Sequence, residues 1–442
     1  MNLLNLLSAR AEPIRCAVLG CGKFATMFLS QARRLPNLHV AAVADLSAER
    51  ARVALMEAGY PAEGIGSPSL QRAVAEGTTY VTEQSGDLLG ASGIDVVVEA
   101  TGDPLAATEH AAAAIDGGQH VVMVSVEADV LVGPLLAQRA GRNGVVYSMA
   151  YGDQPALISE LVDWARIVGL DVVAAGKGTK YLPEYHSSTP ETVWDHYGFT
   201  VAYAREARLN AAMFNSFLDG TKSAIEMAAV ANATGLVPPE DGLRFPPAGV
   251  DDLAAVCIPE AAGGALPHSG TVEVVSSLHR DGSEVARDLR WGVYVTVQAP
   301  SDYVARCFAE YGLSTDASGR FTTMYRPYHL IGLELTVSVV SAALRGEPTG
   351  TPAYLTADVV ATAKRDLTAG DELDGEGGFT VFGMLTTAAA SRASQLLPIG
   401  LARGARVLRP APRGTPLSWA DVEVPGDSLA RRLRTELLQR SE

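Results

Sequence analysis

The chain has 442 residues, a length that predicts roughly two to four domains, and 48% of its residues are hydrophobic. Charged residues make up only 19%, which is typical of a packed globular protein and excludes a disordered or coiled-coil chain. Because 35 basic residues face 50 acidic ones, the net charge of -15 argues against a general affinity for nucleic acid or anionic membranes.

The cysteines and the apolar segments bear on the cellular compartment. Cys16, Cys21, Cys257 and Cys307 show no CxxC or Cys/His spacing, so we expect a reducing compartment and no thiolate metal site. Residues 1–13 lack the basic region and long apolar core of a secretory signal. No window reaches the ~18 apolar residues of a membrane span. We therefore expect a cytoplasmic protein with no membrane partner.

Short apolar runs alternate with helix-length segments over the first 150 residues. The runs begin near positions 14, 39, 94, 119 and 144, and each is almost continuously apolar. Such runs are typical of parallel strands that are buried on both faces. The pattern predicts an α/β fold with a doubly wound Rossmann domain over residues 1–150.

The pattern changes after residue 150. Helical stretches mix with alternating runs such as TVEVVSSLHR over residues 151–345, which predicts an α+β substrate domain with an antiparallel sheet. The segment RGEPTGTPAY has the composition of a linker. Short strands and turns then follow over residues 353–427, which predicts a small all-β module.

A glycine motif marks the turn after the first expected strand. Residues 20–25 fit G-x-G-x-x-G/A, where glycines let the backbone approach a pyrophosphate at a helix N-terminus. The residues expected to bind the dinucleotide are Gly20, Gly22, Lys23, Phe24 and Ala25 in the turn and Asp45 after the second strand. Asp45 favours NAD, but Lys23, Ser47 and Arg50 lie near enough in sequence to accept the 2'-phosphate of NADP. The motif thus predicts NAD or NADP and leaves the choice open.

The third apolar run ends in small residues. Ala100, Thr101 and Gly102 follow it at the carboxyl end of a strand, where a flat nicotinamide ring needs space. We expect these residues to contact the cofactor; the alternative is an ordinary loop turn.

Four polar residues recur at helical spacing in a largely apolar segment. Asn215, Asp219, Lys222 and Glu226 are spaced by four, three and four residues, which predicts one stripe on one helix. The stripe is either a solvated face or a polar site. Two carboxylates flanking a lysine suit proton transfer, so we expect Lys222 to transfer the proton, with Asp219 and Glu226 holding it.

Two basic clusters are candidates for holding an anionic substrate group. Lys177 and Lys180 lie in a glycine-containing segment expected to be a turn at a strand end, and the alternative is a solvated loop. Arg326 and His329 precede an apolar segment expected to be a helix. An arginine at a helix start opposes the helix dipole, which favours an anion-binding or pairing role.

Longer strings carry a family resemblance. The segments GCGKFATMF, ADLS and VVVEATGDP resemble the nucleotide domain of homoserine dehydrogenases. The strings YGDQPALI, GKGTKY, FNSFLDGTKSAIEMAAVANATGL and YRPYHLIGLE are similar to the 1-deoxy-D-xylulose 5-phosphate reductoisomerase-like family. The segments AKRDLTAGDELD and LPIGLARGARVLRPAPRGTPLSWADVEV resemble a SAF module, a small β-clip unit.

The resemblance implies an NAD(P)-dependent oxidoreductase or reductoisomerase that acts on a phosphorylated or carboxylated sugar-like substrate. The family reaction converts 1-deoxy-D-xylulose 5-phosphate to 2-C-methyl-D-erythritol 4-phosphate. One alternative is an oxidoisomerase of the D-apionate type, and another is a plain hydroxy-acid or homoserine-like dehydrogenase. A third is a non-enzymatic NAD(P)-binding sensor. We also expect a homo-oligomer, with the SAF module as a lid in cis or from a partner subunit.

One departure from the resemblance concerns the chemistry. Residues 125–129 read SVEAD where homoserine dehydrogenases have an Asn-Lys pair, which argues against homoserine oxidation. The metal motif of the isoprenoid reductoisomerases, one Asp and two Glu, is not recognisable. Metal dependence is therefore unknown from the sequence.

Overall fold

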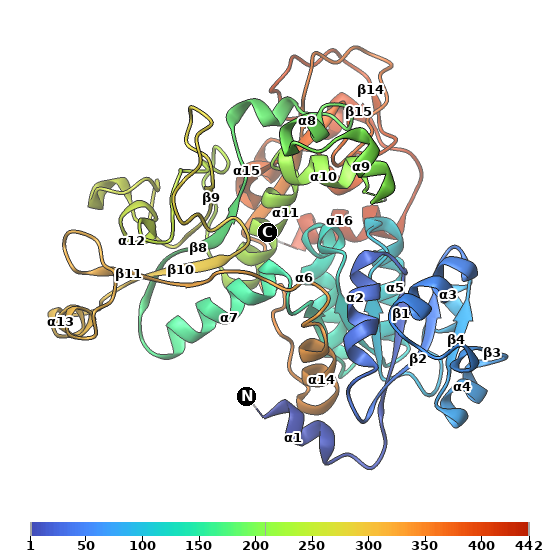
Figure 1. Cartoon of the computed structure of the whole chain (residues 1–442). Helices are drawn as coiled ribbons and strands as arrows, with labels where there is room; N and C mark the ends of the chain where they lie inside the picture. The colour runs from blue at the N-terminus through green and yellow to red at the C-terminus, as the bar shows by residue number, and fades with distance from the viewer. Residues whose placement is uncertain (1, 208, 441–442) are drawn as a thin grey trace. The chain divides into compact units, whose positions relative to one another are not determined.

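The computed structural model describes residues 2–207 and 209–440, apart from the side chain of residue 440. The chain forms two compact units (Figure 1). Unit 1 comprises Met1–Leu157, His329–Ala353 and Ser428–Glu442, and unit 2 comprises Ile158–Tyr328 and Tyr354–Asp427. The expected domain boundaries near 150, 345 and 353 stay a prediction.

Unit 1 is built on a seven-stranded parallel sheet in the order β3-β4-β2-β1-β5-β6-β7. The strands are β1 (Ile14–Leu19), β2 (Leu38–Ala44), β3 (Ile65–Ser67), β4 (Thr79–Thr82), β5 (Val96–Glu99), β6 (His120–Met123) and β7 (Tyr147–Met149). Helices cover both faces, which explains why the strands are apolar on successive residues. The order reverses between β1 and β5, and open α/β sheets bind their ligands at such a point. The α/β fold class is confirmed.

Helices from three parts of the chain belong to unit 1, and most of them pack on this sheet. They are α1 (Leu3–Ser8), α2 (Lys23–Ala32), α3 (Ala48–Glu57), α4 (Leu70–Glu76), α5 (Pro104–Asp116), α6 (Val126–Arg142), α14 (Thr336–Arg345) and α16 (Leu429–Arg440). Helix α14 packs on α2 and on β1, β5, β6 and β7, whereas α16 packs on α5 and α6. Two late segments of the chain therefore complete the nucleotide-binding unit. Helix α7 (Gln154–Ile167) leads from unit 1 into unit 2.

Unit 2 contains a four-stranded sheet in the order β11-β10-β8-β9. The strands are β8 (Asp171–Thr179), β9 (Thr271–Ser276), β10 (Val293–Gln298) and β11 (Phe321–Arg326). We expected an antiparallel sheet, but β8 and β9 run parallel, so the sheet is mixed.

The expected turn around Gly176 and Gly178 is wrong, because both glycines lie inside β8. A Cβ atom on Gly176 would lie 1.7 Å from the Glu273 carbonyl oxygen, and one on Gly178 would lie 2.1 Å from that of Leu289. These glycines allow close packing and form no turn.

The expected single helix over the polar stripe is also wrong. Gly220 adopts a left-handed conformation with φ of 88° and separates α10 (Ala211–Leu218) from α11 (Thr221–Thr234). Helix α11 is buried on nearly every side and packs on α10, β8 and β9. The other helices of unit 2 before the SAF-like segment are α8 (Val193–Tyr197), α9 (Val201–Glu206), α12 (Leu253–Val256) and α13 (Asp302–Glu310).

The SAF-like segment is an integral part of unit 2. Strands β12 (Ala357–Ala363) and β13 (Val381–Thr387) form an antiparallel pair that packs on α11. The Asn232 side chain of α11 accepts hydrogen bonds from the backbone of Thr356 and Ala357. Helix α15 (Ala388–Ala393) and the short pair β14 (Arg406–Val407) and β15 (Val422–Glu423) complete the segment. The hairpin forms part of the packing of α11, so the segment is not merely appended. Its role as a lid stays a prediction.

Candidate active site

The glycine turn after β1 leaves the start of α2 open for an anion. Gly20 has a φ of 89°, and a Cβ atom there would lie 2.6 Å from the Ala100 carbonyl oxygen, so this position requires glycine. Gly22 is the N-cap of α2 and gives no side-chain cap, whereas side chains cap α3, α4 and α5. Lys23 lies in the first turn, and no acidic residue does. These features suit a pyrophosphate at the start of α2.

The other turn residues have defined places. Phe24 is half-buried at the second position of α2, and Ala25 is fully buried in the core. Ala100 lies against Gly20, and Thr101 and Gly102 are exposed at the carboxyl end of β5. The structure thus brings the turn and the 100–102 loop together at the point where the strand order reverses.

Asp45 follows β2 and is 7% exposed. Its Oδ2 atom accepts a hydrogen bond from the Cys21 backbone N–H at 2.8 Å, so the carboxylate holds the glycine turn. Its Oδ1 atom accepts from the Ser47 backbone at 2.9 Å and from Arg50 Nε at 2.8 Å. Burial, followed by the Asp45 charge, raises the pKa of the Cys21 thiol to about 12, so this cysteine stays protonated.

A fully buried carboxylate fastens the loop that follows β5. Glu99 accepts hydrogen bonds from Thr101 Oγ1 at 2.6 Å and from Ser125 Oγ at 2.5 Å. The Ser125 hydroxyl in turn accepts from the Gly102 backbone N–H at 2.9 Å. His110 Nδ1 lies 3.3 Å from the same carboxylate. Sequence reasoning did not assign Glu99, Ser125 or His110 to the site. Glu99 and Ser125 lie within or just beyond the apolar runs that predicted this edge, whereas His110 lies in the middle of α5.

In unit 2, neighbouring strands bring two of the basic candidates into one row. Lys177 of β8 and Arg326 of β11 are both register partners of Val293 in β10. Side chains opposite one another in antiparallel pairs project from the same face, so Lys177 and Arg326 lie on one face two strands apart. Arg326 thus ends a strand and does not start a helix, because α14 begins only at Thr336.

Helix α11 presents a carboxylate to Lys177 of this row, and a second lysine lies one turn earlier in the helix. Glu226 pairs with the Lys177 ammonium, and both side chains are at most 5% exposed. Lys222 lies four residues before Glu226 in the same helix, so it shares the helix face that meets Lys177. Lys222 and Arg326 are half-buried. The sheet-end cluster, which we define as Lys177, Lys222, Glu226 and Arg326, therefore carries three basic groups and one acid.

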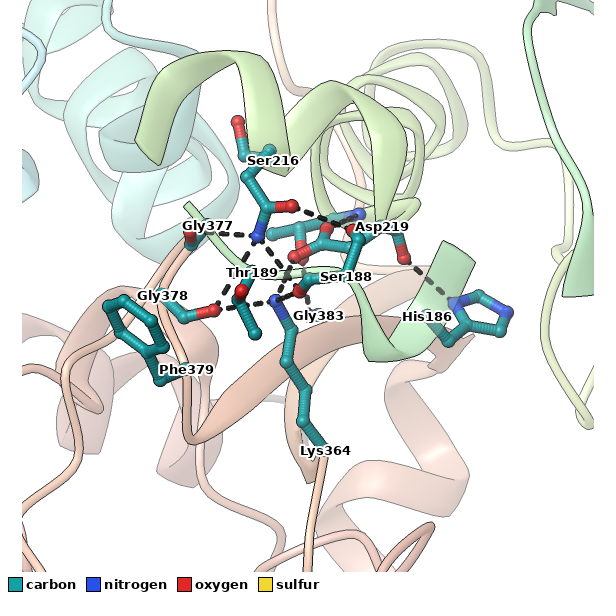
Figure 2. A network of polar contacts seen from close by, with 12 residues as sticks. His186, Ser188, Thr189, Ser216, Asp219, Lys364, Gly377, Gly378, Phe379 and Gly383 are labelled. Atoms are coloured by element: carbon teal, nitrogen blue, oxygen red, sulfur yellow. Dashed lines mark hydrogen bonds and ion pairs between the residues drawn. The ribbon is translucent and has the colours of Figure 1, made fainter. Parts of the chain in front are cut away.

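The remaining acid of the expected stripe has another partner. The Asp219 carboxylate lies 2.6 Å from the Lys364 ammonium, which comes from the end of β12 (Figure 2). Lys364 also donates to the backbone carbonyls of Ser188 at 2.9 Å and Gly378 at 2.7 Å. Burial raises the pKa of Asp219, and the Lys364 charge opposes this rise. Asp219 and Glu226 thus pair with Lys364 and Lys177, and not with Lys222 as we expected.

Asn215 joins the same buried network and is not exposed to substrate. Its amide donates to the backbone carbonyls of Ser188 at 3.1 Å and Gly377 at 2.9 Å, and its Oδ1 atom accepts from Ser188 Oγ at 2.7 Å. Asn215 and Asp219 are both 0% exposed, so the alternative of a solvated stripe is wrong. These residues join α10 to the SAF-like segment.

His186 contacts the α10–α11 turn, and Lys180 contacts α8. His186 Nδ1 lies 2.7 Å from the Asp219 backbone oxygen (Figure 2), and its Nε2 lies 2.9 Å from the Tyr181 hydroxyl. Burial lowers the pKa of His186, which favours the neutral imidazole. Lys180 donates to the His196 backbone carbonyl at 2.5 Å, and burial lowers the pKa of Lys180.

The two residues of the second basic candidate cluster belong to different units. His329 is the first residue of the segment His329–Ala353 of unit 1, whereas Arg326 belongs to unit 2.

Sequence reasoning missed Lys364. Lys364 follows β12, whose sequence ADVVATA contains Asp358 and Thr362, and it precedes Arg365 and Asp366. Nothing in this charged segment distinguishes a buried lysine from an exposed one. Across residues 2–207 and 209–440, no three His, Cys, Asp or Glu side chains form a metal-binding group. In the same described ranges, no helix is long and apolar enough to cross a membrane.

Three family models match successive parts of the chain. The homoserine dehydrogenase NAD-binding domain matches residues 20–148, the catalytic domain of oxidoreductase DRL matches 152–335, and the SAF domain matches 358–423. These matches confirm the resemblance inferred from the sequence. The chain is an NAD(P)-dependent oxidoreductase with NAD or NADP as its cofactor. No curated protein matches the chain.

Several solved structures show low similarity. The putative oxidoreductase yvaA from Bacillus subtilis is 11% identical, with 76% of this chain and 90% of that chain covered and a TM-score of 0.39. The apo scyllo-inositol dehydrogenase from Lactobacillus casei is 15% identical, with 39% and 46% covered and a TM-score of 0.27. The WlbA dehydrogenase from Bordetella pertussis is 18% identical, with 38% and 46% covered and a TM-score of 0.27. The last two matches span less than half of those chains, and such low scores support no conclusion about substrate.

Proposed function

We propose that this chain transfers hydride between NAD(P) and a sugar-derived carbonyl or alcohol, coupled to rearrangement of the substrate's carbon skeleton. The conversion of 1-deoxy-D-xylulose 5-phosphate to 2-C-methyl-D-erythritol 4-phosphate is the model reaction. The observation that carries the proposal is the sheet-end cluster, because its three basic groups and one acid lie within the segment that matches the DRL catalytic domain.

The chemical roles follow from charge and exposure. In the reducing direction, hydride adds to the carbonyl carbon and a proton adds to its oxygen, so an alcohol and NAD(P)+ form. Lys222 is the proposed proton donor, because it is half-buried and lies one helical turn from Glu226. Arg326 is proposed to hold the phosphate or carboxylate of the substrate, and Lys180 and His329 are secondary candidates.

The roles expected from the sequence are revised for four residues. Asp219 and Glu226 are proposed as positioning residues that fix the start of α11 through Lys364 and Lys177. Lys177 is 4% exposed, so it sets the charge around Glu226 and is not proposed as a direct ligand of an anion. Asn215 is likewise assigned to positioning.

The test is a screen of NAD(P)H oxidation and NAD(P)+ reduction against sugar phosphates and branched sugar acids, with NMR of the products. The proposal expects turnover and a product with a rearranged carbon skeleton. Turnover without rearrangement would identify a plain dehydrogenase. Rearrangement of a branched sugar acid alone would identify an oxidoisomerase of the D-apionate type. Cofactor binding without turnover of any substrate would favour the sensor.

A further inference from the structure

The carboxylate of Asp45 is largely occupied by the protein itself. Its Oδ1 atom accepts from the Ser47 backbone and from Arg50, and its Oδ2 atom accepts from the Cys21 backbone. A carboxylate offers about four acceptor positions, two on each oxygen. Only Oδ2 therefore has room for another donor. A site dedicated to NAD uses this carboxylate to bind the ribose hydroxyls.

The Arg50 side chain, next to Asp45, has more N–H donors than its contacts with Asp45 use. It pairs with Asp45 through Nε and Nη2, yet its side chain remains 58% exposed. A guanidinium carries five N–H donors, so at least part of its edge is open to a ligand. Within the described ranges, Asp45 is the acid with which Arg50 forms an ion pair.

We propose that Asp45 and Arg50 let one site accept both NAD and NADP. Asp45 Oδ2 would accept one ribose hydroxyl of NAD, and the open edge of Arg50 would donate to the 2'-phosphate of NADP. This inference rests on the cofactor binding that the proposed function requires, and it names the residue that admits the phosphate.

The charges around the site balance. Lys23 is exposed at the start of α2, and Arg50 adds a second positive charge. Asp45 opposes them, and so does Glu83, whose carboxylate accepts from the Ala48 backbone at the start of α3. Because two basic and two acidic groups balance, the local electrostatic potential neither excludes nor requires the 2'-phosphate of NADP. We therefore expect removal of Arg50 to determine how strongly the site discriminates between NAD and NADP.

The experiment measures Kd values of the full chain for NADH and NADPH by fluorescence titration, and for 5'-ADP and 2',5'-ADP by calorimetry. We expect the wild-type Kd values for the two dinucleotides to agree within about tenfold. Arg50→Gln should raise the Kd for NADPH and 2',5'-ADP by about tenfold or more, and that for NADH and 5'-ADP by less than about threefold. The control Arg52→Gln removes an equal charge from an exposed residue of α3 and should change neither.

Different results would overturn different claims. Equal losses for both dinucleotides in Arg50→Gln, or no loss for either, would refute the role of Arg50. A wild-type Kd for NADPH above that for NADH by about a hundredfold or more, or the reverse, would refute dual acceptance. Wild-type protein that is folded but binds neither dinucleotide would refute the proposed function itself.

Discussion

The Lys364 ammonium lies 2.6 Å from the Asp219 carboxylate, and both side chains are at most 2% exposed. One comes from the SAF-like segment and the other from the turn between α10 and α11. Two backbone carbonyls, of Ser188 and Gly378, also accept hydrogen bonds from Lys364. The SAF-like segment thus supplies the positive charge that opposes the rise in the pKa of Asp219 caused by burial.

Loss of this charge should destabilise unit 2. Lys364→Met leaves the Asp219 carboxylate buried without a counter-ion, and breaking such a pair costs about 3–5 kcal/mol. Urea unfolding should show this decrease in the free energy of unfolding. The control Arg365→Met removes an exposed partner of Asp371 and should cost less than about 1 kcal/mol. Equal losses in both variants would contradict the role assigned to Lys364.

A chain that ends at Gly350 tests how the whole SAF-like segment, and not Lys364 alone, contributes to stability. It loses the β12–β13 hairpin that covers α11 and also α16, which packs on α5 and α6. Because both units then expose apolar surface, we expect aggregation or loss of cooperative unfolding in calorimetry. A folded, monodisperse truncated chain with unchanged kcat and KM would show that the segment is dispensable.

The nucleotide unit could be predicted from the sequence because its signals are local. A strand, a glycine turn and a helix follow one another, and Asp45 comes directly after the next strand. The α10–α11 stripe could not, because helical spacing does not reveal that Gly220 adopts a left-handed conformation. The ion-pair partner of Asp219 could not be predicted either. Asp219 has a lysine three residues away, yet it pairs with Lys364, and only tertiary packing determines that choice.

Gly22→Val should weaken dinucleotide binding without unfolding unit 1. A Cβ atom at Gly22 meets no atom within 4 Å, so the protein itself tolerates the side chain. The valine would occupy the space next to the uncapped start of α2, and we expect a Kd higher by about ten- to a hundredfold. The control Gly86→Val also adds a side chain in open space, in the 3-10 helix at Ser85–Asp87. Equal Kd values in the two variants would place the pyrophosphate elsewhere.

Lys222→Met tests the proposed proton donor. We expect kcat to fall by the ~100- to 10,000-fold that loss of acid–base catalysis causes, with the Kd of the dinucleotide nearly unchanged. Arg326→Met serves as the comparison, because loss of an anion-binding group should raise the substrate KM more than it lowers kcat. Near-normal turnover of Lys222→Met would assign the proton transfer to another group.

Asp129 should make the stability of unit 1 depend on pH. It is 2% exposed and accepts a hydrogen bond from the Tyr147 hydroxyl at 3.0 Å, and its Oδ2 atom has no hydrogen-bond partner among the described residues. Burial raises the pKa of Asp129 from 3.8 to about 7, and the Tyr147 bond opposes this only in part. Between these two values the folded state binds more protons than the unfolded state. The free energy of unfolding should therefore fall as pH rises from about 4 to about 7, by up to about 1.4 kcal/mol per pH unit, and then stay low.

The amide of Asp129→Asn does not titrate, so this contribution should vanish in urea unfolding measured from pH 4 to pH 8. Glu273 of unit 2 provides the matched control, because burial also raises its pKa to about 7. Each of the variants Asp129→Asn and Glu273→Gln should remove the contribution of one carboxyl to the dependence of the free energy of unfolding on pH. The double variant should remove both contributions. If Asp129→Asn keeps the wild-type pH dependence while Glu273→Gln loses part of it, Asp129 has an ordinary pKa and is solvated in the folded protein.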